Sequence, residues 1–266
     1  MKDLCADLLA EYDALAALCA TLSPEQWQRK TQFYGWTPWD EIAHLCYFDE
    51  TGLLAATNAD AFAADTRTLM AEQESGKEIS QIARERFGHL DGAQLLQLWR
   101  ERYQALVAAL AELDPKARLP WYGPTMSARS FATARLMETW AHGQDVYDSV
   151  PARRPLSGRL RHIAHIGVTT FGWTFVNRKL PVPPVAPYIV LQAPDGESWT
   201  WNTPSDNDYV RGSAEDFCLV VTQRRNVRDT GLDYAGAGAE AWLPIAQCFA
   251  GPPVDGPAPG VRAVRY

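Results

Sequence analysis

Two residues with metal-binding side chains stand four positions apart in the middle of the chain. Glu138 and His142 are the ends of the run Glu-Thr-Trp-Ala-His. On a helix, this spacing puts the carboxylate and the imidazole on one face, within reach of a single metal ion. His44 stands in another apolar stretch with helical periodicity. Together the three would supply two imidazoles and one carboxylate, and would leave a coordination position open for water or substrate, as catalytic sites do.

The spacing also fits two interpretations without a metal. Glutamate and histidine four residues apart often form a pair on a helix surface. A single histidine on an apolar helix face is more often a core residue than a ligand. The choice among these interpretations depends on the elements that position the three residues.

The helix that carries His44 has a clear start. Thr37 is expected to cap it, Pro38 occupies the first turn, where a missing N–H costs nothing, and Asp40 favours the positive end of the helix. We expect this helix to run to about Asn58.

Apolar periodicity predicts three further long helices, over residues 1–21, 93–113 and 128–149. One or two short helices are expected within residues 59–91. Four long helices with a crossover insertion make a bundle that can hold an inward-facing site. The sequence therefore predicts a mainly α protein with a four-helix bundle over residues 1–150.

The composition changes after Pro151, and residues 151–255 are expected to form a small α+β domain. Two β-rich runs flank Pro194-Asp-Gly-Glu197, which is a hairpin signal. The last stretch, residues 256–266, is rich in proline and glycine and is expected to be a loose tail. Helical patterns in this half cover residues 157–178, 214–222 and 240–250.

The composition excludes several classes of partner. The net charge of -7 argues against nucleic acid and anionic membranes, because both need a basic surface. No segment approaches the roughly 20 apolar residues that span a bilayer, and the first residues contain acids where a signal peptide is apolar. We expect a cytoplasmic protein with a small-molecule substrate. The five cysteines, without a C-x-x-C pair, are expected to be buried reduced thiols.

The residues around the candidate ligands resemble a known family. Gly35–Leu45, GWTPWDEIAHL, is similar to the G-W-[ST]-x-x-D-x-x-A-H-L signature of the DinB / mycothiol-dependent maleylpyruvate isomerase superfamily, and Ala134–Asp145, ARLMETWAHGQD, resembles its second element. The likeness is closest to a subgroup of uncharacterised metal-binding proteins. It implies that His44, Glu138 and His142 hold a divalent metal. Zinc is usual in the family, and the donor set also suits nickel, manganese or iron(II).

The resemblance also implies thiol chemistry. A low-molecular-weight thiol, mycothiol or glutathione, would bind near the metal, and its thiolate would attack a small electrophile. The expected protein is therefore a metal- and thiol-dependent transferase or isomerase. In the isomerase branch an arginine of the C-terminal domain reaches the pocket. Its match here is Arg224, although Gln223 stands where the family pattern has glycine.

Other residues are weaker candidates for the site. Trp121 and Tyr122 precede the second ligand-bearing helix and would form a pocket wall for the thiol or substrate, or simply pack. Arg129 would neutralise an anionic group, or be solvated. His162 and His165 would face the metal as catalytic proton shuttles, or be structural histidines. Asp145, three residues past His142, is a candidate hydrogen-bond acceptor for an imidazole N–H.

Two other functions fit the same ligands. A metal-dependent hydrolase would use metal-bound water and would need a general base, for which His162 and His165 are candidates. A non-enzymatic protein would use the metal and the aromatic residues to hold a small molecule. Both a monomer and a homodimer fit the sequence.

Overall fold

A computed structural model describes residues 1–150 and 152–263. The chain divides into two compact units, Met1–Pro151 and Ala152–Tyr266. Pro151, where the sequence predicts the start of the second domain, and the last three residues of the predicted tail lie outside the described residues.

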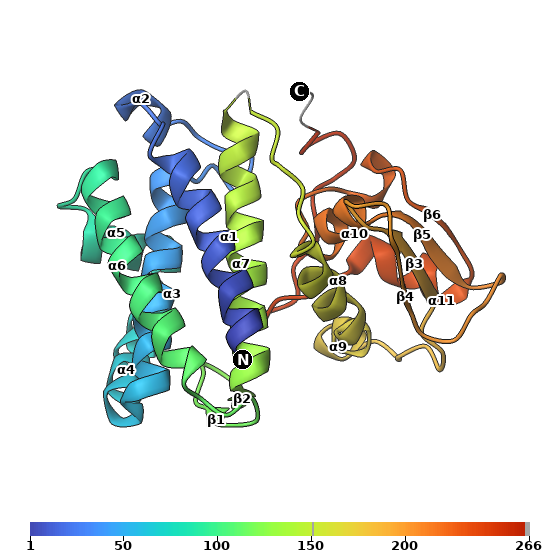
Figure 1. Ribbon diagram of the computed structural model, residues 1–266, viewed down its shortest axis with the longest axis horizontal. Helices are drawn as coiled ribbons and strands as arrows, with labels where there is room; N and C mark the ends of the chain where they lie inside the picture. Colours follow the sequence, from blue (N-terminus) through green and yellow to red (C-terminus); the bar gives the residue numbers. More distant parts are fainter. Residues whose placement is uncertain (151, 264–266) are drawn as a thin grey trace. The chain divides into compact units, whose positions relative to one another are not determined.

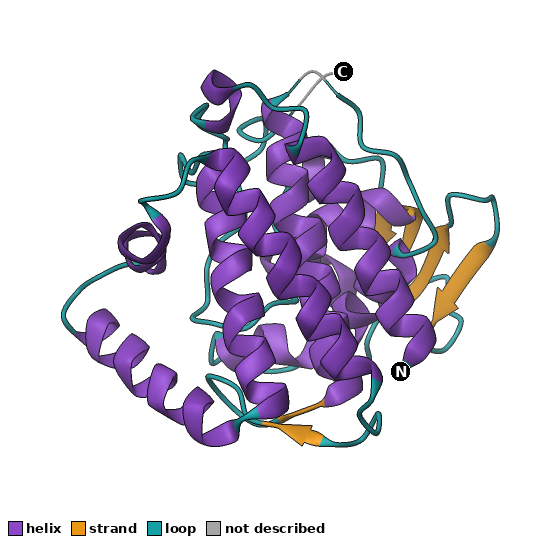
Figure 2. Ribbon diagram, turned by 60° about the vertical axis from the view of Figure 1, so that its left-hand side comes forward, coloured by secondary structure: helices purple, strands orange, loops and turns teal. Residues whose placement is uncertain are grey.

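The first unit is built on four long helices, shown side by side in Figure 2. Helices α1 and α3 each pack against both α6 and α7, which makes a four-helix bundle and confirms the predicted fold class. Figure 1 labels these helices: α1 (Lys2–Cys19), α3 (Pro38–Thr57), α6 (Gly92–Ala111) and α7 (Ala128–Ser149). Shorter elements connect them: α2 (Pro24–Trp27), α4 (Ala59–Glu74), α5 (Ile79–Phe87), β1 (Arg118–Leu119) and β2 (Met126–Ser127).

Side-chain caps fix where the two helices that carry the candidate ligands begin. The Thr37 hydroxyl accepts a hydrogen bond from the Asp40 N–H, and the Asp40 carboxylate accepts one from the Thr37 N–H at 2.9 Å. This reciprocal pair satisfies N–H groups that the first helical turn leaves without partners. Ser127 caps α7 by accepting from the Ser130 N–H at 3.0 Å. The predicted starts of both helices are confirmed.

One buried carboxylate joins all four long helices. Asp49 of α3 accepts hydrogen bonds from Tyr12 Oη of α1 at 2.5 Å, Trp99 Nε1 of α6 at 2.8 Å and Arg135 Nε of α7 at 2.9 Å. Burial alone would lower the pKa of Arg135, but the charge of Asp49 raises it, so the guanidinium stays protonated. Because these directional bonds come from each long helix, they fix the rotation and axial register of the bundle.

The second unit contains a four-stranded sheet with the order β4-β3-β5-β6. The predicted hairpin is confirmed, because β3 and β4 pair antiparallel, with Ile189 opposite Trp201 and Gln192 opposite Ser198. Helix α10 packs on β3 and β5. The strands are β3 (Tyr188–Gln192), β4 (Ser198–Trp201), β5 (Tyr209–Ser213) and β6 (Asp233–Ala235). The helices are α8 (Leu160–Thr169), α9 (Phe171–Asn177), α10 (Ala214–Val221) and α11 (Ala237–Trp242), with 3₁₀ turns η1 (Val227–Asp229) and η2 (Leu243–Ile245).

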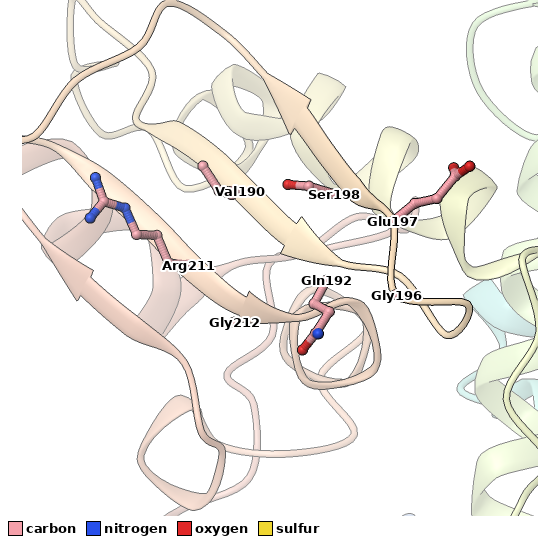
Figure 3. Close-up of a pocket in the computed structure, with 7 residues that line it drawn as sticks. All are labelled: Val190, Gln192, Gly196, Glu197, Ser198, Arg211 and Gly212. Carbon is pink, nitrogen blue, oxygen red and sulfur yellow. The ribbon is translucent and has the colours of Figure 1, made fainter.

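The two faces of this sheet differ. One face is apolar and includes the buried side chains of Ile189, Leu191 and Val210. The other face has a pocket lined from adjacent strands by residues including Gln192 and Arg211 (Figure 3). Arg211 forms an ion pair with Asp206 at 2.7 Å, so its charge already has a partner.

Two helix predictions in this unit are wrong in detail. The helix predicted over residues 157–178 is two helices, α8 and α9, that meet at Thr170, whose hydroxyl donates to the Ile166 carbonyl at 2.7 Å and competes with the backbone ladder. The pattern at residues 240–250 is α-helical only to Trp242. Pro244, which lacks an N–H, lies in the 3₁₀ turn that follows. Cys248 therefore lies outside the helices, although all five cysteines are buried thiols, as predicted.

Residues 256–263 of the predicted loose tail are hydrogen-bonded to the rest of the second unit. The Gly260 N–H donates to Asp229 at 2.8 Å, and Arg262 Nη1 donates to the Gln223 carbonyl at 2.9 Å. The Pro257 carbonyl accepts from Asn226 Nδ2 at 2.9 Å.

Removing the central carboxylate should strongly destabilise the bundle. Asp49→Ala leaves the Arg135 charge and two further donors buried without an acceptor, which we expect to lower the free energy of unfolding by about 3–5 kcal/mol. Urea denaturation followed by circular dichroism measures this change. The exposed Glu74→Ala is the matched control and should change it by less than about 0.5 kcal/mol. A loss for Asp49→Ala as small as that of the control would contradict the role of Asp49.

Candidate metal centre

The three candidate ligands converge between α3 and α7. His142 Nε2 lies 3.3 Å from Glu138 Oε2, and His44 Nε2 lies 3.9 Å from the same oxygen. The centroids of the two imidazole rings are 4.4 Å apart. All three side chains belong to the first unit, so the bundle alone brings them together.

These separations fit one divalent ion. Two ligands at about 2.1 Å from a tetrahedral zinc lie about 3.4 Å from each other. The 3.3 Å separation matches this value, and the 3.9 Å separation exceeds it by about 0.5 Å, which a small side-chain movement closes. The donors are imidazole nitrogen and carboxylate oxygen, the set that zinc, nickel, manganese and iron(II) accept.

A second acidic cluster shares His142. Glu41 and Asp145 are buried beside it, and one donor atom of each residue lies within 4.8 Å of the others. His142 Nδ1 is only 2.7 Å from Glu41 Oε2, which is a hydrogen-bond distance and too short for two ligands of one ion. Glu41 therefore accepts a hydrogen bond from His142 Nδ1–H, while Nε2 faces Glu138 and His44.

Sequence reasoning missed Glu41 as the acceptor for His142 and considered Asp145 instead. A signal was present, because Glu41 lies three residues before His44 and therefore on the same side of α3. The partner itself is 101 residues away in the sequence, which helix periodicity within one segment does not detect.

Aromatic rings surround the two imidazoles. The Trp36 ring is nearly parallel to His142, with centroids 5.9 Å apart, and Phe33 meets His142 edge-on at 5.4 Å. Phe48 contacts His44 at 4.8 Å. These rings restrict the rotation of both imidazoles and keep water from their faces. Phe33 and Phe48 were not predicted as part of the site.

The centre keeps access to solvent through Glu138. A quarter of the Glu138 side chain is exposed, against 14% for His44 and 6% for His142. Burial would raise the pKa of Glu138, but the neighbouring imidazoles of His142 and His44 outweigh it and hold the pKa well below its usual value. The carboxylate is therefore ionised at neutral pH, as a metal ligand must be.

Trp121 and Tyr122 are separated from the candidate ligand His44 by the ring of Phe48. They occupy the loop between β1 and β2, and their ring centroids are 6.1 and 5.6 Å from that of Phe48, which in turn contacts His44. Arg129 is exposed in the first turn of α7. It lies nine residues before Glu138, about 13 Å along the helix axis, so the structure does not bring it to the ligands.

The remaining candidates belong to the second unit. On α8, His162 is half-buried and His165 is exposed. Arg224 is buried just after α10, where its backbone N–H donates to the Leu219 carbonyl and its Nη1 donates to the Thr222 carbonyl, both at 2.8 Å.

The backbone at Gln223 explains the glycine in the family pattern. Gln223 has a φ of 59°, the left-handed conformation that glycine usually supplies after a helix. Its side-chain amide donates to the carbonyls of Ala246 and Val254, at 3.0 and 2.9 Å. These bonds offset the strain of a residue with a Cβ in this conformation. The turn that positions Arg224 is therefore retained without the glycine.

A known family model matches the part of the chain that contains this candidate site. Residues 8–147, which include all three candidate ligands, match the family model of the mycothiol maleylpyruvate isomerase N-terminal domain. The chain belongs to this family. Two uncharacterised proteins of Mycobacterium tuberculosis, from strains CDC 1551 / Oshkosh and H37Rv, are 43% identical to it over 252 residues, which are 94% of this chain and 96% of each relative.

Two solved structures share the fold of this chain. The crystal structures of the mycothiol-dependent maleylpyruvate isomerase and of a mutant of it both align with a TM-score of 0.52 at 15% identity, over 82% of this chain and 87% of that chain. At this identity the match shows a shared fold. Within the described residues, no helix is long and apolar enough to cross a membrane.

Each of the three ligands should be needed for metal binding. We expect the purified chain to bind about one equivalent of zinc, and His44→Ala, Glu138→Ala and His142→Ala each to weaken binding at least about 10-fold, because two remaining ligands hold zinc poorly. Zinc content after dialysis against a metal buffer, measured by plasma mass spectrometry, gives the answer. His89→Ala, exposed in the same unit, should bind like the wild type. Zinc retained in full by all three variants would contradict this assignment.

Proposed function

We propose that this protein is a metal-dependent enzyme that uses a low-molecular-weight thiol, mycothiol or glutathione, to isomerise or transfer a group on a small electrophile. The observation that carries the proposal is the convergence of His44 and His142 on one carboxylate oxygen of Glu138 in a partly open site. Membership of the maleylpyruvate isomerase N-terminal family supports the thiol part of the proposal.

His44, Glu138 and His142 would hold the ion, most simply zinc, and would leave one position for a small ligand. A bound divalent metal lowers the pKa of a coordinating thiol and so supplies thiolate at neutral pH. Neighbouring side chains restrict the orientation of the ligand His142. Glu41 holds His142 by its far nitrogen, and the Trp36 and Phe33 rings cover the imidazole. Trp121 and Tyr122 extend the aromatic wall through Phe48.

The reaction that follows depends on the electrophile. With a conjugated carbonyl compound, the thiolate sulfur adds to the double bond, and the electron pair moves to the carbonyl oxygen. Rotation about the resulting single bond and elimination of the thiolate then give the isomer. We assign to Arg224 the stabilisation of the negative charge on that oxygen, and to His162 and His165 the transfer of protons. With a substrate that holds a leaving group, the thiolate sulfur would instead form a bond to the carbon that carries this group, the leaving group would depart with the bonding electron pair, and the thiol would keep the transferred carbon group.

Turnover should depend on both thiol and metal. We expect the chain with zinc and mycothiol, or glutathione, to consume maleylpyruvate or another conjugated electrophile. Chelation or His142→Ala should lower the rate at least about 100-fold, because both remove the site that activates the thiol. Absorbance of the conjugated substrate follows the reaction, and added zinc should restore the chelated wild type but not the variant. Hydrolysis of esters or amides without any thiol would contradict the proposal and favour metal-bound water as the nucleophile.

A further inference from the structure

Glu41 connects a metal ligand to a loop that lines the site. Its carboxylate is fully buried in α3. Oε2 accepts from His142 Nδ1 at 2.7 Å, and Oε1 accepts from the Thr31 hydroxyl at 3.4 Å. The Thr31 N–H in turn donates to the Trp36 carbonyl at 2.7 Å, so the same carboxylate contacts the loop that supplies the aromatic ring over His142.

The hydrogen bond decides which nitrogen of His142 can bind a metal. A neutral imidazole has one N–H, and an ionised carboxylate can only accept. Nδ1 lies 2.7 Å from Glu41, whereas Nε2 lies 3.3 Å from Glu138, so the proton is on Nδ1 and the lone pair of Nε2 points toward Glu138 and His44. The flanking rings of Trp36 and Phe33 do not make this choice, because an imidazole turned by half a rotation has nearly the same shape. The shorter contact with Glu41 distinguishes the two nitrogens, because Nε2 lies farther from its own carboxylate neighbour, Glu138.

We propose that Glu41 is a positioning residue of the metal centre. It fixes the tautomer and orientation of His142, makes Nε2 the ligand, and thereby sets the affinity for the ion. It touches neither substrate nor metal and acts through His142. The inference rests on the proposed metal centre and deepens it, because it assigns part of the metal affinity to a buried residue outside the ligand set.

Metal affinity of the full chain tests the inference. Zinc competition against a chromogenic chelator should show Glu41→Gln weakened about 10–100-fold, since loss of the outer partner of a ligating histidine has this effect. Glu41→Asp retains a charged acceptor and should lie between Glu41→Gln and the wild type. The matched control is Glu50→Gln, which removes a carboxylate of the same helix that pairs with Arg86 and should stay within about 2-fold. The visible spectrum of the cobalt-loaded chain should change in Glu41→Gln and not in Glu50→Gln.

The wild-type chain provides a second readout that does not depend on the folding of a variant. Nitrogen-15 NMR of the zinc-loaded protein should show His142 bound through Nε2 with its proton on Nδ1, the signal being identified by its loss in His142→Ala. Coordination through Nδ1 would overturn the inference, as would a folded Glu41→Gln with wild-type zinc affinity and cobalt spectrum. A wild type without zinc affinity overturns the metal centre itself, so the two failures are distinguishable.

Discussion

The carboxylate of Asp49 is the point on which the N-terminal unit depends. It is fully buried and binds a side chain from each of the other three long helices. Asp49 follows His44 on α3, and its partner Arg135 precedes Glu138 by one turn on α7. The ion pair therefore fastens the two helices that carry the ligands, close to the ligands themselves. Separating α3 from α7 would leave a buried charge without its partner, which is costly, so this ion pair helps to hold His44 close to Glu138 and His142.

The electrostatics around His142 favour a cation. Glu41, Glu138 and Asp145 bring three carboxylates to one imidazole, and two of them are fully or almost fully buried. A buried carboxylate is stable where a cation or hydrogen-bond donors accompany its charge. A divalent ion between Glu138 and the histidines would neutralise part of it, while the hydrogen bond to Glu41 keeps the second carboxylate out of the coordination sphere. The aromatic rings of Trp36, Phe33 and Phe48 lower the local polarity and strengthen both interactions.

Local signals in the sequence were sufficient to predict the long helices and the candidate ligands, but not the residues that contact those ligands from distant parts of the chain. Capping at Thr37 and Ser127 depends on residues within one turn, so the starts of α3 and α7 could be predicted, as could the shared face of Glu138 and His142. The Glu41–His142 and Asp49–Arg135 contacts join residues far apart in the chain, and only tertiary packing reveals them. Helical periodicity did not predict the break at Thr170 or the early end of α11, because each depends on a single residue: the Thr170 hydroxyl at the break, and Pro244 after α11. Likewise, Gln223 retains a left-handed turn through side-chain bonds that the sequence pattern does not show.

We propose that this bundle holds one metal ion through two imidazoles and a carboxylate, with a position open to a thiol. X-ray absorption at the zinc edge of the full chain tests it most directly. Coordination by His44, Glu138 and His142 should give only nitrogen and oxygen neighbours of zinc in the resting protein, with the multiple-scattering signal of two imidazoles. On addition of mycothiol or glutathione, a single sulfur should appear at about 2.3 Å. Cysteine sulfur bound to zinc before any thiol is added, or a zinc environment that saturating thiol leaves unchanged, would contradict the proposed centre.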